Sequence, residues 1–338
     1  MTAVLVTRRL PEPALAPLAG YELRLPSGEN GFTAAELLDA APGVEAILCV
    51  LSDQITAAVI AAAPRLRVVG NIAVGYDNID VAAAEAAGVV VVNTPGILDE
   101  ATADLAFMLI LAAARGCGDA ERDLRAGGWT GWSLNGYLGR DVHGATLGLV
   151  GYGRIARAVA RRASGFDMTV LHHTRTDTGM PGYVPDLDEL LTRADIISVH
   201  VPYTAATHHL IGARELALLG PEAVLVNTAR GAVVDEAALA AALHENRLFG
   251  AGLDVYANEP SVHPGLLSAP RTVLLPHIGS ATARTRMRMA RVAAEGVAAV
   301  LANRAHDATR VTAVDPPAGS RRESPAKLTD DQEPREAR

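Results

Sequence analysis

The sequence has little cysteine and no excess of positive charge, and each absence excludes a class of protein. Only Cys49 and Cys117 occur among 338 residues, which excludes a disulfide framework and a cysteine-based metal cluster, and no metal site is expected. Both cysteines have apolar neighbours, so we expect buried, inert thiols. Lys and Arg number 30 and Asp and Glu 38, for a net charge of −8. Nucleic-acid binders normally carry a basic face, so no nucleic-acid partner is expected.

Long hydrophobic runs are also missing. The longest extends from Leu105 to Ala114 and has only ten residues, whereas a membrane-spanning helix needs about 20. At the N-terminus, Met1–Thr7 is predicted to form a short strand, and Arg8 and Arg9 follow it, which is the reverse of the order in a signal peptide. We therefore expect a soluble, cytoplasmic protein with no membrane partner.

What the sequence does contain is an alternation of short apolar runs with alanine-rich helical stretches. Its length suggests about two domains. Strands buried on both faces read as continuous apolar runs, and their alternation with helices predicts an α/β fold with parallel sheets. The expected strands are Ala46–Val50, Arg67–Val69, Val89–Val92, Thr146–Val150, Thr169–Leu171, Ile196–Val199, Ala223–Val226, Gly250–Leu253 and Thr272–Leu275.

Two long helical stretches punctuate this pattern, at Ala101–Arg125 and Ala281–Asn303. The first separates two groups of strands, and the second follows the last strand. From about Asp315 the composition changes to charged residues, Pro and Ser. Such a segment has too few apolar residues to offset the entropy of ordering, so the tail is predicted to be disordered.

A dinucleotide fingerprint follows the expected strand Thr146–Val150. It has Gly at 151 and 153 and Ala at 156, where an amphipathic helix begins. Gly151 permits the tight turn, Gly153 lets the backbone approach a pyrophosphate, and Ala156 lets helix and strand pack closely. The helix N-terminus then presents unpaired N–H groups to the phosphates. Incidental glycines in a strand–helix turn are the alternative, but the flanking strand and helix favour dinucleotide binding.

The residues after the next strand address the choice of cofactor. An NAD site normally has an acid about 20 residues after the glycines, but Thr174 stands 21 residues after Gly153, followed by Arg175 and Thr176. A guanidinium and hydroxyls would hold a 2′-phosphate that a carboxylate would repel. We therefore predict a preference for NADP(H). Asp177 keeps NAD(H) binding open, with Arg175 as a solvated loop residue.

Three further strand ends carry chemically useful side chains. Arg230 follows one apolar run, Asp254 and Glu259 follow the next, and His277 follows the last. Reduction of a 2-oxo acid needs a cation for the carboxylate and carbonyl, and an imidazole for the proton. A nearby carboxylate favours the protonated imidazole. Each residue alone also fits a surface, turn or loop position, but their joint occurrence at strand ends favours catalysis.

Taken together, these motifs resemble the D-isomer-specific 2-hydroxyacid dehydrogenases, and most closely the glyoxylate/hydroxypyruvate reductases. The resemblance covers about residues 45 to 305. It rests on the stretches at 74–80 (VGYDNID), 92–96 (VNTPG), 127–129 (GGW), 151–155 (GYGRI), 227–231 (NTARG), 252–255 (GLDV), 258–260 (NEP) and 276–282 (PHIGSAT).

The resemblance implies roles for individual residues. Arg230, Glu259 and His277 correspond to the family's catalytic residues. Substrate contacts are implied for Leu51, Ser52, Val74 and Gly75, the last two through backbone N–H groups, and for Trp132, an aromatic that reaches a partner subunit's active site. Cofactor contacts are implied for Thr102, Gly151, Gly153, Arg154, Ile155, Thr174, Arg175, Thr176, Val201, Pro202, Thr207, Thr228, Ala229, Asp254, His277 and Gly279.

The family fold implies two doubly wound parallel-sheet domains of the Rossmann/flavodoxin type, with the coenzyme domain inserted into the substrate domain. Residues 1–98 and 280–315 would form the substrate domain, 99–279 the NAD(P)-binding domain, and 316–338 the disordered tail. The two long helices would cross between the domains, and a homodimer would form through residues 101–140. The unusual loop Ser133–Tyr137 bears on which substrate side chain is accepted.

The expected activity is reduction of a small 2-oxo acid, glyoxylate or hydroxypyruvate, to a D-2-hydroxy acid with NADPH. One alternative is a relative that acts on 3-phosphoglycerate, D-lactate or formate. The phosphoglycerate enzymes usually prefer NAD and often carry a regulatory domain, whereas only a short tail follows residue 315. The other alternative is a dinucleotide-sensing module like the family's corepressors, which retain the same residues.

Overall fold

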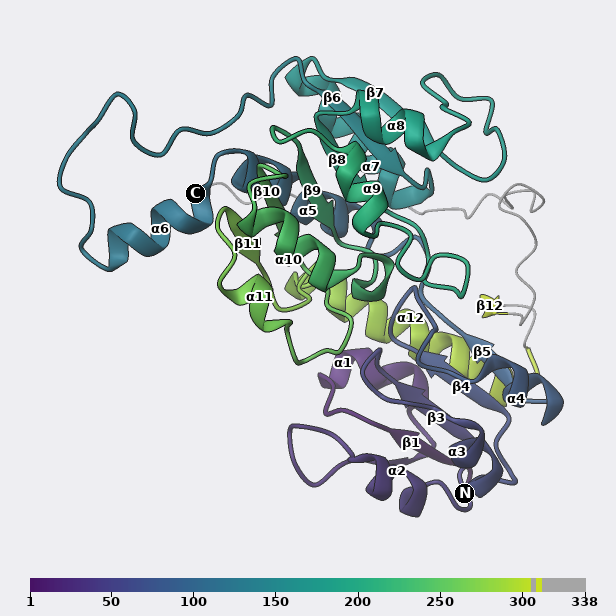
Figure 1. Cartoon of the computed structure of the whole chain (residues 1–338). Coiled ribbons are helices and arrows are strands. Elements are labelled where there is room, and N and C mark those ends of the chain that lie inside the picture. Colours follow the sequence, from purple (N-terminus) through teal and green to yellow (C-terminus); the bar gives the residue numbers. More distant parts are fainter. Residues whose placement is uncertain (305–307, 312–338) are drawn as a thin grey trace, which may run out of the picture.

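The computed structural model describes residues 1–304 and 308–311. These residues build two adjacent α/β domains, each around its own sheet (Figure 1). The tail at 316–338, predicted to be disordered, lies outside the described residues. The strands are β1 (Ala3–Val6), β2 (Glu22–Arg24), β3 (Ala46–Cys49), β4 (Val68–Asn71), β5 (Val90–Val92), β6 (Thr146–Val150), β7 (Thr169–His173), β8 (Ile196–Val199), β9 (Val224–Asn227), β10 (Gly250–Leu253), β11 (Thr272–Leu274) and β12 (Arg310–Val311).

The strands form two separate sheets, which confirms the predicted fold class. The first has the order β12-β5-β4-β3-β1-β2, and the second the order β11-β10-β9-β8-β6-β7. All pairings are parallel except that of β12 with β5. In each sheet the order of the strands reverses beside the strand that comes first in the sequence, β1 or β6, which is the doubly wound arrangement. The polar edge strands β2 and β12 were not among the strands expected from the apolar runs.

Helices cover both faces of each sheet. They are α1 (Glu12–Leu15), α2 (Ala34–Ala40), α3 (Ala57–Ala62), α4 (Val81–Ala86), α5 (Asp99–Ala114), α6 (Cys117–Arg125), α7 (Arg154–Ala163), α8 (Leu187–Arg193), α9 (Ala213–Leu218), α10 (Glu236–His244), α11 (Pro264–Leu267) and α12 (Ala283–Leu301), with short 3-10 turns at Ala16–Leu18, Ser164–Phe166 and Gly231–Val233. Polar side chains cap the N-termini of several helices, as N-cap residues do. A side chain accepts a backbone N–H from the first turn at Thr33, Asp80, Asp235 and Thr282.

The two long helices pack on different sheets. Helix α12 contacts β3, β4 and β5 of the first sheet, whereas α5 contacts β9, β10 and helix α7 of the second. Their buried apolar faces complete one core layer in each half, around Val297 in the first and around Leu109 in the second. The elements that connect the two sheets are therefore also core helices, which ties the sheets to each other at their junction.

The continuous helix predicted for Ala101–Arg125 is wrong. Helix α5 ends at Ala114, because Gly116 adopts a left-handed φ of +60°. Helix α6 then starts at Cys117, and the two helices are bent by 71° relative to each other. Glycine tolerates this conformation at little cost. Helix α6 has no buried residues, so Cys117 is exposed, in contrast to the predicted buried thiol, while Cys49 is buried as expected.

No single helix among the described residues has both the length and the apolar composition needed to cross a bilayer. The pair α5 and α6 meets the length and composition criteria together, but the pair is sharply bent and half of the α5 residues are buried in the protein.

The second sheet has its switch point between β6 and β8, where the two strands end beside each other. Gly151, with a φ of +93°, follows β6, and a side chain there would come within 2.8 Å of the carbonyl oxygen of His200. The His200 ring bonds through Nε2 to the Ser198 hydroxyl at 2.8 Å. Burial lowers the pKa of His200 to about 4. This imidazole is therefore neutral in the folded protein at neutral pH.

We expect His200 to contribute to acid sensitivity. Between pH 6.5, the ordinary pKa, and about 4, the unfolded chain binds a proton at this residue that the folded chain does not. The free energy of unfolding should thus fall as the pH falls through this window. Urea denaturation of His200→Gln should show a shallower pH dependence than the wild type, whereas the exposed His143→Gln should match the wild type. Equal slopes for all three proteins would contradict the assignment.

Candidate active site

The Arg230 side chain is placed by a turn that the sequence shapes in two ways. Asn227, the last residue of β9, accepts the N–H of Ala229 at 3.0 Å and donates its amide to the carbonyl of Arg230 at 2.9 Å. The next residue, Gly231, packs so closely on the following loop that a Cβ would lie 1.9 Å from the Tyr256 carbonyl carbon. The close approach requires glycine. Together they fix where Arg230 leaves the sheet.

Arg230 reaches across to the first sheet and pairs with Asp77. Its Nε lies 2.9 Å from Oδ1 and 3.1 Å from Oδ2 of that carboxylate, and its Nη2 lies 2.9 Å from Oδ1. A Cβ on Gly75 would be 1.7 Å from Nη2. The guanidinium therefore lies directly on the loop that contains Val74 and Gly75, which the sequence assigned to the substrate carboxylate.

The Val74–Gly75 loop is held by its carbonyl groups. Asn71 donates to the Gly75 carbonyl at 2.8 Å, and Asn93 donates to the Val74 carbonyl at 2.7 Å. Within residues 1–304 and 308–311, the amide N–H groups of Val74 and Gly75 have no hydrogen-bond partner. The loop thus presents two free N–H donors beside the Arg230 guanidinium.

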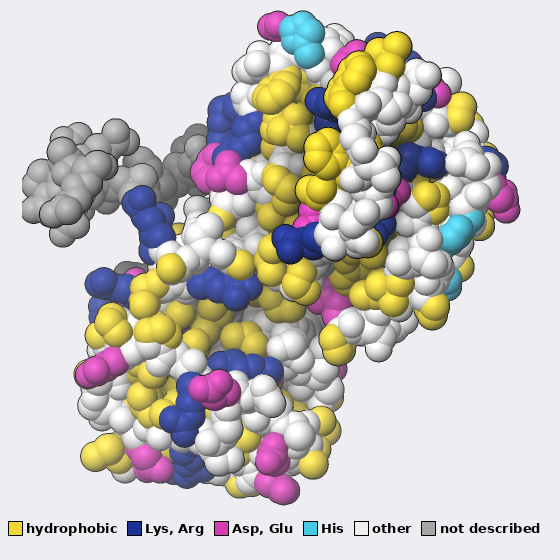
Figure 2. Space-filling model, turned by 90° about the vertical axis from the view of Figure 1, so that its left-hand side faces the viewer, with side chains coloured by type: hydrophobic (Ala, Val, Ile, Leu, Met, Phe, Trp, Pro, Cys, Tyr) yellow, Lys and Arg dark blue, Asp and Glu magenta, His cyan; other side chains and the backbone are white. Residues whose placement is uncertain are grey.

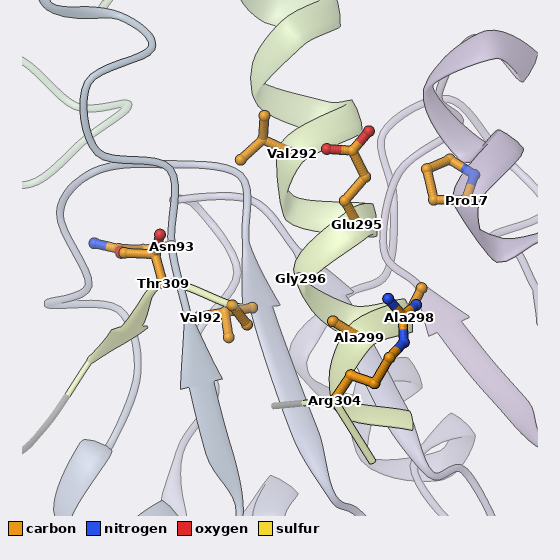
Figure 3. A pocket seen from close by; sticks show the side chains of 11 residues that line it. Pro17, Val92, Asn93, Val292, Glu295, Gly296, Ala298, Ala299, Arg304 and Thr309 are labelled. Atoms are coloured by element: carbon orange, nitrogen blue, oxygen red, sulfur yellow. The ribbon is translucent and has the colours of Figure 1, made fainter. Parts of the chain in front are cut away.

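Asn93 also lines a pocket of about 400 Å³ between α12 and β5 (Figure 3).

The predicted substrate-side loop at Leu51–Ser52 follows β3 at the same edge. The neighbouring Asp53 is buried and accepts the Val50 N–H at 3.0 Å and the Thr7 hydroxyl at 2.5 Å. Arg8 bridges Asp53 at 2.7 Å and the Ser52 hydroxyl at 3.1 Å. Buried acceptors with several donors hold a loop in one conformation, so this loop is anchored beneath Leu51 and Ser52.

His277 and Glu259 form a hydrogen-bonded pair. Nδ1 of His277 lies 2.8 Å from Oε2 of Glu259, and the other carboxylate oxygen accepts the Tyr256 N–H at 3.0 Å. The pairing at Nδ1 leaves Nε2 as the nitrogen that can exchange a proton with a bound molecule. His277 has a left-handed φ of +52°, which is uncommon for a non-glycine residue.

The electrostatics of this pair tie it to Arg230. Burial raises the pKa of Glu259, but the hydrogen bonds from His277 and the Tyr256 N–H, with the charges of His277 and Arg230, outweigh it and leave the pKa below its ordinary value. Glu259 is thus a carboxylate at neutral pH. The turn that carries Arg230 packs through Gly231 on Tyr256 and Ala257, in the loop that leads to Glu259, so Arg230 leaves the sheet at the same end as the His277–Glu259 pair.

Asp254 has a different environment from Glu259. It is buried, and its two oxygens accept the N–H groups of Ile278 and Gly279, each at 2.7 Å. Burial raises the pKa of Asp254 although these two hydrogen bonds lower it. The side chain of Thr102 also lies against Gly279. Asp254, for which the resemblance implies a cofactor contact, therefore also anchors the loop that follows His277.

The end of the second sheet beside Gly151 has the features that a dinucleotide needs. Gly153 begins α7 without a side-chain cap, and a Cβ there would meet no atom within 4 Å. Uncapped N–H groups at a helix N-terminus bind phosphate. The hydroxyl oxygen of Thr228, at the end of β9, is buried without a hydrogen-bond partner in the described chain. These residues fit a nicotinamide dinucleotide.

The remaining predicted cofactor residues lie around the same sheet edge. Arg175 is exposed after β7, and the Thr174 hydroxyl bonds to the Thr176 carbonyl at 2.6 Å. Thr207 closes the loop after β8 by donating to the Pro202 carbonyl at 2.7 Å. The other members lie at the same strand ends, namely Val201 after β8, Ala229 after β9, and Ile155 with Arg154 in the first turn of α7, where Arg154 pairs with Asp99 at 3.0 Å.

Trp132 does not join this cluster within the chain. It belongs to an arm, defined as α6 and the loop to Arg140, which extends away from the sheets (Figure 1). The Trp132 side chain is 83% exposed. Apolar side chains gather along the arm where it faces the viewer in Figure 2, and its exposed apolar residues are Leu124, Trp129, Trp132, Leu134, Tyr137 and Leu138.

Sequence reasoning missed Asp77 and the asparagines that hold the loops. Asp77 stands two residues after Gly75, within the quoted stretch VGYDNID, but its pairing with Arg230 across 153 positions carries no local signal. As for metals, the described residues contain no group of three or more His, Cys, Asp or Glu side chains arranged to hold an ion.

Comparison with known proteins agrees with this geometry. Residues 107–279 match the D-isomer specific 2-hydroxyacid dehydrogenase, NAD binding domain. A glyoxylate reductase of Thermococcus onnurineus is 44% identical over 306 residues, which cover 88% of this chain and 92% of the relative.

Solved structures agree as well. A protein from Thermus thermophilus has a TM-score of 0.86 and 44% identity, over 92% of this chain and all of that chain. An NADPH-dependent glyoxylate/hydroxypyruvate reductase from Sinorhizobium meliloti, in complex with NADP and malonate, has a TM-score of 0.80 and 37% identity, over 92% of this chain and 96% of that chain.

The domain match covers the strands β6 to β11 of the second sheet, and the relatives cover most of the chain. The match to an NAD-binding domain also supports a nicotinamide dinucleotide as the cofactor. The chain belongs to the D-isomer specific 2-hydroxyacid dehydrogenase family, whose members are oxidoreductases that act on CH–OH donors.

Proposed function

We propose that this enzyme reduces a small 2-oxo acid, glyoxylate or hydroxypyruvate, to the D-2-hydroxy acid, with NADPH as the preferred reductant. The observation that carries the proposal is the His277–Glu259 pair beside Arg230 and the free Val74 and Gly75 amides. The curated relatives and the Sinorhizobium meliloti neighbour, named as glyoxylate or glyoxylate/hydroxypyruvate reductases, support the substrate class.

In this proposal each polar group has one task. Bound NADPH supplies a hydride to the carbonyl carbon of the substrate. Arg230 and the amides of Val74 and Gly75 hold the substrate carboxylate and polarise the adjacent carbonyl. His277 Nε2 gives its proton to the carbonyl oxygen, and Glu259 favours the protonated imidazole. The products are the hydroxy acid and NADP⁺, so one hydride and one proton are consumed per turnover.

The division of labour between the sheets follows. Residues 1–98 with 280–315 would form the substrate domain, and residues 99–279 the cofactor domain. The assignment is supported by the loops after β3 and β4, which present Ser52 and Gly75, and by the strand end at Gly151 on the other sheet. Closure of the two halves around the ligands would exclude water from the reaction.

A substrate panel tests the function directly. Purified enzyme should oxidise NADPH with glyoxylate and hydroxypyruvate, and more slowly with pyruvate or 3-phosphohydroxypyruvate, as followed by absorbance at the reduced nicotinamide band. An enzyme that binds NADPH but turns over none of these acids would instead favour a dinucleotide-sensing module.

We expect His277 to be required for the chemical step. His277→Ala should lower kcat at least 100-fold, the usual minimum for a lost general acid, while the Kd for NADPH, from protein fluorescence, stays within about threefold. The exposed His143→Ala serves as the matched control and should retain full activity. Near-normal turnover of His277→Ala would reject it as the proton donor.

Glu259 should be needed to orient the imidazole of His277. Its Oε2 lies 2.8 Å from Nδ1, which leaves Nε2 for the substrate. Glu259→Ala, which removes this acceptor, should lower kcat with glyoxylate about tenfold, the size of one lost charge-assisted hydrogen bond, when measured under saturating NADPH. An unchanged kcat in Glu259→Ala would separate Glu259 from this role.

Arg175 should account for the cofactor preference. It is exposed and, within the described residues, has no ion-pair partner, so its guanidinium is available for a 2′-phosphate. Arg175→Ala should raise KM for NADPH about tenfold, in line with the loss of a charge-assisted hydrogen bond, and leave KM for NADH nearly unchanged. Arg193→Ala, an exposed arginine of α8, is the control. Equal losses with both cofactors would remove the argument.

The arm supports a homodimer, which belongs to the same proposal. It exposes the six apolar residues named above, which together form a strip, and three of them, Leu124, Trp129 and Tyr137, line one pocket; exposed apolar patches on single chains mark association surfaces. A second copy of the chain would cover the strip, and Trp132 would reach the partner's substrate site.

A further inference from the structure

We propose that Asp77 is the positioning residue that orients Arg230 toward the substrate carboxylate, by occupying one edge of the guanidinium and leaving the other edge free. The inference rests on the proposed function, because it concerns how that site holds its substrate. Asp77 was assigned no role by the motifs, although it lies in the loop that they identified.

The hydrogen bonds of Arg230 show which edge is occupied. A guanidinium has five N–H groups in a fixed plane. Nε and one N–H of Nη2 form the side edge, and both bind the Asp77 carboxylate at 2.9 to 3.1 Å. Nη1 donates one N–H to the Ala229 carbonyl at 2.8 Å. The remaining N–H groups, one on Nη1 and one on Nη2, lie parallel on the end edge.

The free edge has the spacing that a carboxylate needs. Two parallel N–H groups on one guanidinium edge bind both oxygens of a carboxylate in a bidentate pair. The same Nη2 atom lies against Gly75, whose amide N–H, with that of Val74, has no partner in the described residues. The end edge and the two amides therefore form one receptor for a single carboxylate.

Asp77 itself is placed firmly enough to act in this way. The next residue, Asn78, is buried and donates its side-chain amide to the carbonyls of Val50 and Asp53, at 3.2 and 2.9 Å. Its own carbonyl accepts the Ile55 N–H at 2.9 Å. These bonds fix the backbone beside Asp77 to the neighbouring loop of the same sheet. The backbone that carries Asp77 is therefore held in place, so its carboxylate gives the Arg230 side chain a partner at a fixed position.

The alternative is that Asp77 only weakens the positive charge of Arg230. The two roles predict opposite effects of Asp77→Asn on substrate binding. Loss of a positioning carboxylate frees the guanidinium to rotate, so KM for glyoxylate should rise about tenfold, the size of one lost charge-assisted hydrogen bond. Loss of a competing negative charge would instead lower KM. A fall in KM, or no change, would overturn the proposal.

A double-mutant cycle distinguishes positioning from a structural role. Lysine has no side edge and no planar fork, so in Arg230→Lys the same Asp77→Asn change should alter KM less than twofold. Independent, additive losses would show that Asp77 acts elsewhere and would contradict the inference. Asp77→Glu, which keeps the charge and moves the carboxylate, should show an intermediate rise in KM.

Controls keep the result interpretable. Asp80→Asn, an acid three residues further along that caps α4, should leave KM unchanged, because asparagine also caps helices. Melting temperature and the Kd for NADPH should be the same in Asp77→Asn as in the wild type. A wild type that turns over no 2-oxo acid would defeat the proposed function itself, whereas a competent wild type with an unaffected Asp77→Asn variant would defeat only this inference.

Discussion

Parallel strand pairing is the constraint on which the site depends. In a parallel sheet all carboxyl ends lie at one edge, so residues distant in sequence emerge together. Neighbouring strands β9, β10 and β11 are followed by Arg230, Glu259 and His277 in turn. The first sheet contributes its own edge through Ser52 and Gly75. Because Arg230 bonds to Asp77 of that sheet, the two edges face each other across one ion pair.

Asparagine does similar work at the ends of two equivalent strands. Asn71 ends β4 and Asn227 ends β9, and each donates its amide to a carbonyl three or four residues on, in Gly75 and in Arg230. A side-chain amide satisfies backbone groups that no neighbouring strand can reach. These bonds pair the carbonyls of Gly75 and Arg230. Within the described residues, the N–H groups of Val74 and Gly75 stay without a partner.

Much of this arrangement was predictable, because the fold repeats a simple rule. Apolar runs gave the central strands, and the residues just after them gave Arg230, Glu259 and His277. The break at Gly116 was not, because glycines within a helical pattern, here Gly116 and Gly118, do not indicate the direction in which the chain continues. The exposure of Cys117 follows from that break. Asp77 escaped prediction for a different reason, since its partner is 153 positions away.

The two carboxylates after β10 show how one loop separates catalysis from support. Glu259 and Asp254 are five positions apart, yet their pKa values move in opposite directions. Burial dominates at Asp254, whose oxygens accept backbone N–H groups, whereas bonds from His277 and Tyr256 dominate at Glu259. Opposed shifts in one site separate roles. Glu259 faces the imidazole of His277, with Oε2 at 2.8 Å from Nδ1, whereas Asp254 holds the backbone that follows His277 through the N–H groups of Ile278 and Gly279.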